Sequence, residues 1–287
     1  MNLPLVVGVD GSEPSLQAVD WAADEATLHG LPLHVVFASL WERYEGAALA
    51  RSLGKPSALL RAEDIVRAAA RRARNRRPDV QVTTAVVPEE AEYALARAGR
   101  EAFGLVVGNR GRSGLAGLLL GSVSLTLAAG ATCPVIVIRG SHGSGALAGR
   151  QGRIVVGVGE APAAALRFAY AEARLRAVPL EAVRAWRCPA HETVDHPLLT
   201  GEPARLYEER AAKELEAALA DAPRDVDLRR RTAEGPARSV LPAASREAAL
   251  LIVGRRRPGQ FEPQLGRVAY TVLHHAACPV VVVPEQV

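Results

Sequence analysis

Aromatic residues, cysteines and long apolar segments are all scarce in this chain of 287 residues. Aromatics make up 4% of it and hydrophobic residues 49%, so the core has to be built mainly from Val, Leu, Ile and Ala. Three cysteines are an odd number and too few for a disulfide scaffold. No apolar run approaches the roughly 20 residues of a membrane-spanning helix, and the first residues lack the pattern of a secretory signal. Together these features predict a soluble, cytoplasmic protein.

The net charge is also modest, at a formal +4. The arginines are spread along predicted helices and are not interleaved with aromatics, so the composition requires no nucleic-acid partner. The densest cationic segment, Arg71 to Arg77, ends a predicted helix, where cations complement the helix dipole. A solvated face is favoured there over a nucleic-acid contact. We therefore expect neither a nucleic acid nor a membrane as a partner.

Two segments end in the same phrase, which indicates an internal repeat. Leu125 to Ile138 reads LTLAAGATCPVIVI, and Tyr270 to Val283 reads YTVLHHAACPVVVV. Self-similarity of this kind marks a duplicated unit, so the length favours two domains. A Gly/Ser-rich stretch between the halves is typical of a flexible linker. The predicted boundaries are 1–140 for the first domain, 141–152 for the linker and 153–287 for the second domain.

Strand and helix patterns alternate along the first half. Leu3 to Val9 is a continuous apolar run, typical of a strand buried on both faces. A polar segment with Pro14 then introduces a helix over 16–29 that ends at Gly30. Strands joined through helices need crossover connections, which predicts an α/β fold with an open, doubly wound, five-stranded parallel sheet. The strand order that we expect for it is 3-2-1-4-5. Further helices are predicted at 57–77, 89–101 and 122–129, and further strands at 33–38, 80–86, 105–107 and 134–138.

The second half repeats this plan, which predicts two such sheets in tandem. Strands are expected at 153–158, 179–185, 227–232 and 250–253, and a long helix at 205–220. The apolar final strands, 135–138 and 280–283, would be sheet edges, and uncovered edges of this kind are hazards. We therefore expect the two halves to pair as an intrachain pseudo-dimer. A homodimer of whole chains is compatible with the same pattern.

A glycine ladder lies upstream of the first repeated phrase. Gly108 and Gly111 are followed, after nine residues, by Gly121 and Ser122. Consecutive backbone N–H groups at the positive end of a helix bind phosphate oxygens well, and glycine lacks the Cβ that would keep a phosphate away. The alternative is that these glycines only permit tight turns. That alternative is favoured for one Gly-x-x-Gly pair, whereas the full spacing between a strand and a helix is far more specific.

At these residues the chain resembles the universal stress protein family in its tandem-domain form. The family pattern of two spaced glycines, nine residues and Gly-Ser or Gly-Thr is matched without a gap. The segments VVGVDGS, from Val6 to Ser12, and ATCPV, from Ala131 to Val135, also look like that family's first and last strands. The resemblance implies a non-catalytic stress or signalling regulator that binds ATP, alone or with Mg²⁺. The nucleotide-binding positions that it implies are Val9, Asp10, Ala38, Val107, Gly108, Gly111, Gly121, Ser122, Val123 and Ser124.

The resemblance also implies a role for each of these positions. Asp10 is implied to contact the adenine, which is chemically sensible because a carboxylate accepts from the adenine amino group and repels the guanine carbonyl. Val9 and Ala38 would line the base pocket, and Val107 and Gly108 would flank the ribose. The remaining positions would hold the phosphates, and the two serine hydroxyls would add donors. A plain helix-capping aspartate is the alternative for Asp10.

The second half departs from this pattern at three independent points. Gly159 stands where the aspartate should be, Arg257 replaces the second glycine, and Arg267 replaces the first serine after Gly266. The loop over 255–263 also contains two prolines, which lack N–H donors. We therefore expect one nucleotide per chain, in the N-terminal domain.

Two other functions stay open at this stage. Hydrolysis needs a metal-binding acidic pair and a water-orienting base, and the segment from Gly108 to Ser124 contains no Asp, Glu or His. A slow ATPase is therefore less favoured than a binding protein. A nucleotide-free scaffold that presents surfaces to partners is the other alternative.

The second repeated phrase carries residue types that can bind a metal. His274, His275 and Cys278 lie in a predicted helix, but the matching helix of the first half carries no such set. A core or surface helix is favoured over a metal site, and Cys133 and Cys278 are interpreted as small buried hydrophobes.

Overall fold

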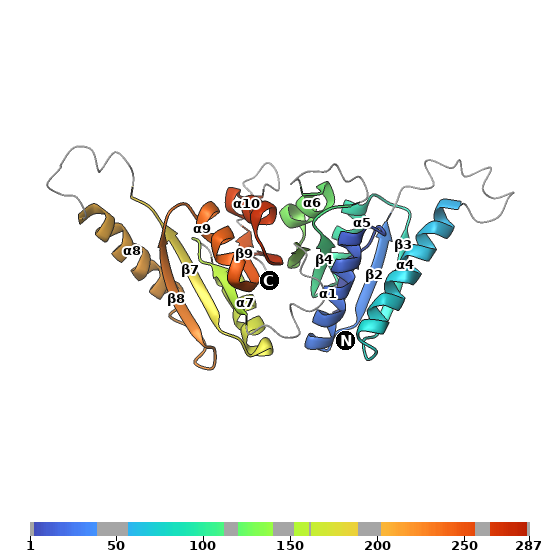
Figure 1. Ribbon diagram of the computed structural model, residues 1–287, viewed down its shortest axis with the longest axis horizontal. Helices are drawn as coiled ribbons and strands as arrows, with labels where there is room; N and C mark the ends of the chain where they lie inside the picture. Colours follow the sequence, from blue (N-terminus) through green and yellow to red (C-terminus); the bar gives the residue numbers. More distant parts are fainter. Residues whose placement is uncertain are drawn as a thin grey trace. The chain divides into compact units, whose positions relative to one another are not determined.

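The computed structural model describes residues 3–38, 57–111, 120–139, 152–160, 162–188, 202–255 and 265–285. These residues form two compact units, one within 3–139 and the other within 152–285, and each is considered by itself (Figure 1). The predicted linker lies outside the described residues except for Gly152. Its bounds, and those of the two domains, stay a prediction.

The first unit is built on a five-stranded parallel sheet in the order β3-β2-β1-β4-β5. Val7 at its centre pairs with Val35 on one side and with Val106 on the other. All three side chains are buried, which is the environment that the apolar runs predicted. The predicted strand order is confirmed. The strands are β1 (Leu5–Gly8), β2 (Leu33–Ala38), β3 (Val82–Val87), β4 (Gly104–Gly108) and β5 (Val135–Ile138).

Four helices flank this sheet in the described part of the first unit. The helix α1 packs against α4, and α5 packs against α6 (Figure 1). Right-handed crossovers place these two pairs on opposite faces, because the chain reverses direction along the sheet after β3. The helices are α1 (Glu13–His29), α4 (Ser57–Arg76), α5 (Ala91–Gly99) and α6 (Ser122–Gly130).

The start of α1 shows how local chemistry sets an element's bounds. The hydroxyl of Ser12 accepts a hydrogen bond from the N–H of Ser15 at 3.4 Å, and Pro14 occupies the first turn. This cap starts the helix at Glu13, three residues before the predicted start at 16. Its other end is as predicted, since Gly30 adopts a left-handed conformation with φ of 63°.

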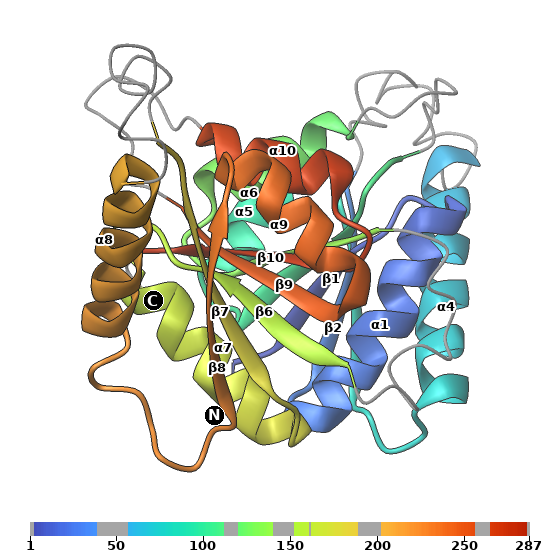
Figure 2. The same cartoon turned by 60° about the vertical axis from the view of Figure 1, so that its left-hand side comes forward.

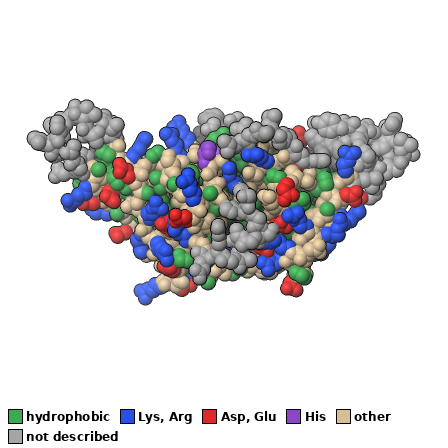
Figure 3. Space-filling model, in the orientation of Figure 1, with side chains coloured by type: hydrophobic (Ala, Val, Ile, Leu, Met, Phe, Trp, Pro, Cys, Tyr) green, Lys and Arg blue, Asp and Glu red, His purple; other side chains and the backbone are tan. Residues whose placement is uncertain are grey.

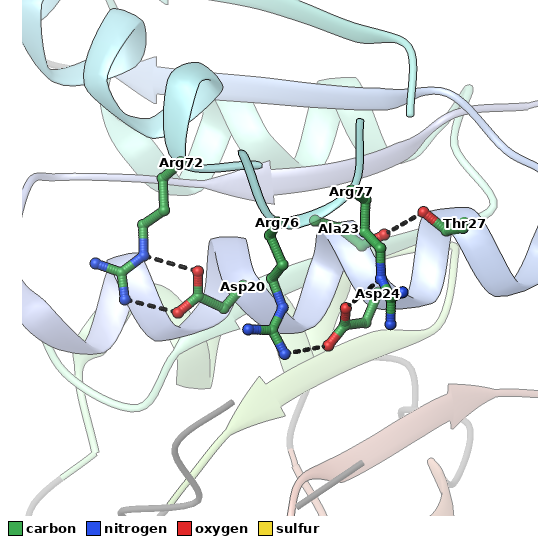
Figure 4. Close-up of polar contacts among 7 residues, drawn as sticks. All are labelled: Asp20, Ala23, Asp24, Thr27, Arg72, Arg76 and Arg77. Atoms are coloured by element: carbon green, nitrogen blue, oxygen red, sulfur yellow. Dashed lines mark hydrogen bonds and ion pairs between the residues drawn. The ribbon is translucent and has the colours of Figure 1, made fainter. Parts of the chain in front are cut away.

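Ion pairs join α1 to α4 (Figure 4). Arg72 donates two hydrogen bonds to the carboxylate of Asp20, at 2.7 and 2.6 Å. Asp24 accepts from Arg76 at 2.5 Å and from Arg77 at 2.6 Å. The cationic end of α4, predicted to be a solvated face, therefore has three of its arginines in contacts with a neighbouring helix. The sequence pattern does not reveal these bonds, because the partners lie 52 and 53 residues apart in the chain.

The second unit has the same sheet order, β8-β7-β6-β9-β10, again all parallel. The helices α9 and α10 pack together (Figure 2). Its strands are β6 (Arg153–Gly157), β7 (Leu180–Trp186), β8 (Leu228–Glu234), β9 (Ala248–Arg255) and β10 (Val280–Pro284). Its helices are α7 (Ala163–Arg176), α8 (Glu202–Ala218), α9 (Ala237–Ala244), a 3₁₀ helix (Ser245–Glu247) and α10 (Arg267–His275).

Side-chain packing repeats between the two units as well. A Cβ placed on Gly8 would lie 2.8 Å from a methyl of Leu95, and a Cβ placed on Gly157 would lie 2.8 Å from a methyl of Leu241. The two glycines end the central strands β1 and β6. The match fixes the structural alignment of the two halves, because each leucine fills the same space beside its glycine.

The described surface carries charges of both signs. On the face drawn in Figure 3, Lys and Arg side chains are interspersed with Asp and Glu. Among the described helices, none combines the length and the apolar character that crossing a lipid bilayer requires.

Candidate functional site

The candidate residues of the first unit meet beyond the carboxyl ends of β1 and β4. Asp10 follows β1, and Gly108 is the last residue of β4. A Cβ placed on Gly121 would lie 3.8 Å from the Cα of Arg110 and 3.9 Å from the N of Gly111. The loop after β4 and the start of α6 are therefore in contact. Ligands bind at this edge in open doubly wound sheets, at the point where strand order reverses.

Asp10 connects the loop after β1 with the loop after β4. Its Oδ1 accepts hydrogen bonds from the N–H of Ser12 at 2.9 Å and from its hydroxyl at 2.6 Å. Its Oδ2 would lie 2.8 Å from a Cβ placed on Gly111. The residue that caps α1 is Ser12 and not Asp10. Asp10 therefore holds the capping residue through hydrogen bonds to one carboxylate oxygen and directs the other oxygen towards the glycine loop.

Gly108 is required by packing rather than by a ligand. A Cβ there would lie 2.8 Å from the backbone C and O of Pro14, and backbone atoms cannot move aside cheaply. The first glycine of the ladder thus lets β4 approach the first turn of α1. The close approach keeps the loop after β4 beside the loop that carries Asp10.

The start of α6 has no side-chain cap. Gly121 precedes the helix in an extended conformation, with φ of −67° and ψ of 151°, and provides no side-chain cap. The N–H groups of Ser122, Val123 and Ser124 form the first turn and so have no partner within the helix. The N–H of Gly121 is occupied, because it donates to the carbonyl of Asn109 at 2.9 Å.

Both serine hydroxyls of this turn have protein partners. Ser124 is buried and donates from Oγ to the carbonyl of Gly108 at 2.7 Å. Ser122 donates from Oγ to Glu92 at 3.2 Å. The hydroxyl of Ser124 therefore ties α6 to β4, and the backbone N–H of this residue is the group left for a ligand.

Two arginines add positive charge at the same edge. The Nε of Arg110 is buried and has no hydrogen-bond partner among the described residues. Burial, and then the nearby charge of Arg110, lower the pKa of Arg139. Two cations that lower each other's stability by charge repulsion create a place where a bound anion is stabilising. Sequence reasoning missed Arg139, although its position directly after β5 at the carboxyl edge was a usable signal.

The remaining candidate positions lie in or directly after the strands that lead to this edge. Val107 precedes Gly108 in β4, Ala38 ends β2, and Val9 follows β1, where its N–H donates to the carbonyl of Val36 at 2.9 Å. Val9 and Val107 are buried, and Ala38 is half-buried. Ala38 thus offers a partly open strand end beside the loop of Asp10.

The second unit differs at the matching positions. Val158 donates to the carbonyl of Val183 at 2.9 Å, as Val9 does to Val36, so Gly159 occupies the position of Asp10. Gly266 precedes α10 in the conformation of Gly121, and Arg267 takes the place of Ser122. The predicted loss at Arg257 lies outside the described residues.

Arg184 is a further difference that the sequence pattern did not reveal. The strand register aligns it with Phe37 of the first unit. Arg184 donates to the carbonyl of Gly159 at 2.8 Å and to that of Val158 at 3.3 Å, and it forms an ion pair with Glu214 of α8. An arginine side chain thus holds the end of β6, beside the position where the first unit has its aspartate.

The histidine and cysteine set of the second repeat lies partly outside the helix in which it was predicted. The helix α10 ends at His275, so Cys278 follows it. Cys278 is buried, and burial raises the pKa of its thiol to about 12. The thiol stays protonated at neutral pH, which fits the interpretation of a small buried hydrophobe.

Comparison with known proteins identifies relatives along nearly the full length. A sequence model of the universal stress protein family matches residues 1–139 and 152–284. Universal stress protein Rv1996 of Mycobacterium tuberculosis (strain ATCC 25618 / H37Rv) is 31% identical over 312 aligned positions, covering 98% of this chain and 95% of the relative. Universal stress protein Rv2005c of the same strain is 33% identical over 304 positions, covering 97% and 96%. The crystal structure of a universal stress protein from Archaeoglobus fulgidus DSM 4304 has the same fold, with a TM-score of 0.69 at 16% identity and 99% coverage of both chains.

Proposed function

The chain belongs to the universal stress protein family, and from this premise and the geometry of its first unit we propose that it binds an adenine nucleotide, ATP, in that unit alone. The observation that carries the proposal is the uncapped start of α6, which lies against Arg110 and the glycine loop. Backbone donors, helix dipole and a buried guanidinium nitrogen without a partner among the described residues favour a polyphosphate there.

The loop after β1 supplies a group that suits a base. Asp10 has one carboxylate oxygen held by Ser12 and the other directed towards the glycine loop. Val9 and Ala38 belong to the same strand ends and would line the base pocket, with Val107 and Gly108 beside the ribose. A fixed carboxylate next to an apolar wall selects a base that presents an amino group, which favours adenine over guanine.

The second unit supports the restriction to one nucleotide. It lacks the carboxylate, and Arg184 holds the strand end beside the position where the carboxylate would lie. Arg267 and Ala269 replace the two serines of the first turn, so the hydroxyl that ties α6 to β4 has no counterpart. The cation Arg139 is replaced by Pro284.

We propose a regulatory protein of the stress response, and not an enzyme. Hydrolysis requires a base that orients water and an acidic pair that holds the metal, and the segment 108–124 supplies no carboxylate or imidazole. Glu92 lies outside this segment, and its carboxylate accepts a hydrogen bond from the hydroxyl of Ser122. Mg²⁺ would be held largely by the phosphates and water when it accompanies the nucleotide, as is usual for this ion.

Matched aspartate substitutions at the two helix starts test the proposal. Gly121→Asp puts a negative charge beside the phosphates, and we expect it to weaken ATP binding at least about tenfold, or ~1.4 kcal/mol. Among the described residues, the nearest atoms to a Cβ at Gly121 lie at 3.8 Å, and a Cβ at Gly266 meets none within 4 Å. Aspartate is a good residue before a helix, so neither variant should unfold the protein.

Titration calorimetry with ATP gives the readout. We expect one site per chain in the wild-type protein, loss of affinity in Gly121→Asp and unchanged affinity in the control Gly266→Asp. Two sites per chain, or equal losses in both variants, would contradict the restriction to the first unit. No binding at all would favour the nucleotide-free scaffold, and turnover of ATP that is lost in Gly121→Asp would favour a slow ATPase.

A further inference from the structure

The second unit retains a cavity where the first unit has its candidate nucleotide site. The cavity measures about 590 Å³, which lies within the range of small-molecule sites in proteins, roughly 300 to 1,000 Å³. Its lining includes the strand ends Val158 and Gly159, the strand end Gly254, and the start of α10 from Gly266 to Ala269. Loss of the nucleotide pattern has therefore not filled the space.

The wall of this cavity is apolar at its centre. Val158, Val183 and Val253 face it from three neighbouring strands, and Leu241 faces it from α9. All four side chains are buried. Such a wall stabilises a compact apolar group by removing the surface of that group from water.

One end of the cavity is closed to an adenine. The guanidinium of Arg184 is occupied by the carbonyls of Val158 and Gly159 and by Glu214. No carboxylate stands at position 159 to accept from an amino group. A part of the ligand that forms no hydrogen bonds therefore suits this end better than a purine does.

The other end attracts a negative charge. Gly266 provides no side-chain cap for α10, and the N–H groups of the first turn have no partner within the helix. Arg267 lines the cavity beside them, and its side chain makes no ion pair or hydrogen bond with a described residue. The other charged lining residues, apart from Arg184, have interactions of their own: Arg255, Glu160 and Glu285.

The charge balance limits what can bind. Three arginines and two glutamates line the cavity, a formal sum of +1 before the ion pair of Arg184 with Glu214 is counted. A triphosphate, which carries several negative charges, is not compensated by so small a sum. One carboxylate or phosphate group is compensated by Arg267 and the helix start.

We propose that the second unit binds a small organic anion that is not a nucleotide. The ligand has one carboxylate or phosphate group, held by Arg267 and the N–H groups of Val268 and Ala269. Its body is compact and apolar and lies against Val158, Val183 and Val253. The protein then carries two different ligand sites on duplicated scaffolds.

The test uses the full chain labelled with ¹⁵N and four probes: phenyl phosphate, benzoate, inorganic phosphate and benzyl alcohol. We expect phenyl phosphate or benzoate to shift the amide signals of Val268 and Ala269 in a saturable way, and the tighter of the two identifies the preferred charged group. Inorganic phosphate and benzyl alcohol, which are the charged and apolar parts alone, should bind at least about tenfold more weakly. These reporter amides belong to the second unit, so the outcome is separate from whether ATP binds the first.

Two variants and one control connect the binding to the cavity. Arg267→Ser restores the residue type of the first unit and should weaken binding at least about tenfold, whereas Arg246→Ser, at an exposed position outside the cavity lining, should not. Gly159→Leu places a side chain where a Cβ meets no atom within 4 Å, and it should also weaken binding. The proposal is overturned by a lack of saturable shifts with both aromatic anions or by equal affinity for inorganic phosphate. It is also overturned if ATP shifts the same amides at lower concentration, or if binding survives Arg267→Ser unchanged.

Discussion

At the scale of single residues, Asp10 combines a structural role with the proposed binding role. Its Oδ1 holds both the N–H and the hydroxyl of Ser12, which caps α1, while its Oδ2 points to the loop of Gly111. A carboxylate with one oxygen fixed by neighbours has little freedom to lose when a ligand arrives. Asp10 can therefore hold Ser12 in the loop and contact the base of the nucleotide at the same time.

Replacing Asp10 by Asn separates these roles. The amide oxygen can still accept from Ser12, but an NH₂ group replaces the second oxygen and donates where the carboxylate accepted. We expect ATP to bind more weakly and GTP more tightly, so that the ratio of their affinities changes by about tenfold, or ~1.4 kcal/mol. Calorimetric titration of both nucleotides measures this ratio. An unchanged ratio accompanied by a lower melting temperature would leave Asp10 with its structural role alone.

At the scale of elements, α4 is held to α1 by charge as well as by apolar packing. Asp20 and Asp24 are nearly buried, and their partners Arg72, Arg76 and Arg77 reach them from the end of α4 (Figure 4). The hydrogen bond from Arg72 to Asp20 raises the pKa of that guanidinium, against the effect of its partial burial. The helix α4 also packs on the loop after β1, where Ile65 would lie 3.2 Å from a Cβ on Gly11. The ion pairs thus help to hold the loop that carries Asp10.

Asp24→Ala tests the strength of this contact. The substitution leaves two arginines without their partner at a site where the carboxylate is only 8% exposed. We expect the free energy of unfolding to fall by about 1 to 3 kcal/mol. Urea unfolding followed by circular dichroism measures the change.

The matched control is Asp64→Ala, which removes an exposed carboxylate from an ion pair within α4 itself. Such pairs contribute about 0 to 1 kcal/mol, so this variant should stay near the wild-type protein. Equal losses from both substitutions would show that the contact between α1 and α4 adds nothing beyond helix stability.

At the scale of the whole molecule, duplication has kept the fold and changed the chemistry. Gly8 and Gly157 meet equivalent leucines, and both sheets have the same order. The differences lie beyond the strand ends, where Asp10 is matched by Gly159 and Ser122 by Arg267. Loops at that edge can change at little cost to the core, because the buried residues of the strands and helices carry most of the packing.

Hydrogen exchange distinguishes the two units in the presence of ATP. A ligand at one hundred times its dissociation constant stabilises the bound form by about 2.7 kcal/mol, which slows exchange through local opening by up to about a hundredfold. We expect this protection in β4 and α6 and not in β9 and α10. Removal of the nucleotide by dialysis should abolish it. Equal protection of α6 and α10 would mean that both units respond to the nucleotide.

Much of the fold was accessible from the sequence, because it depends on local patterns. The apolar run before Gly8, the cap and glycine around α1, and the phrase shared by the two halves predicted the parallel sheets and the repeat. Errors at element ends were of a few residues. The start of α1 was missed because the bond from Ser15 to Ser12 is a property of the turn and not of apolar periodicity.

The candidate site was accessible in part. The glycine ladder and the family resemblance pointed to the start of α6, but not to how its groups are used. Gly108 gives room to Pro14, and the hydroxyl of Ser124 is engaged by the carbonyl of Gly108. Arg139 and Arg184 escaped notice because their importance depends on residues 29 and 30 positions away, Arg110 and Glu214.

The sequence by itself determined the class of fold, the duplication and the place along the chain where a phosphate would bind, since periodicity, capping and glycine spacing act between near neighbours. Only the tertiary structure decided which side-chain hydroxyls of α6 are engaged, which arginine occupies the end of the second sheet, and that a cavity remains there. Those features arise where strands and helices distant in sequence come together, and burial there determines whether a polar group is engaged or left for a ligand.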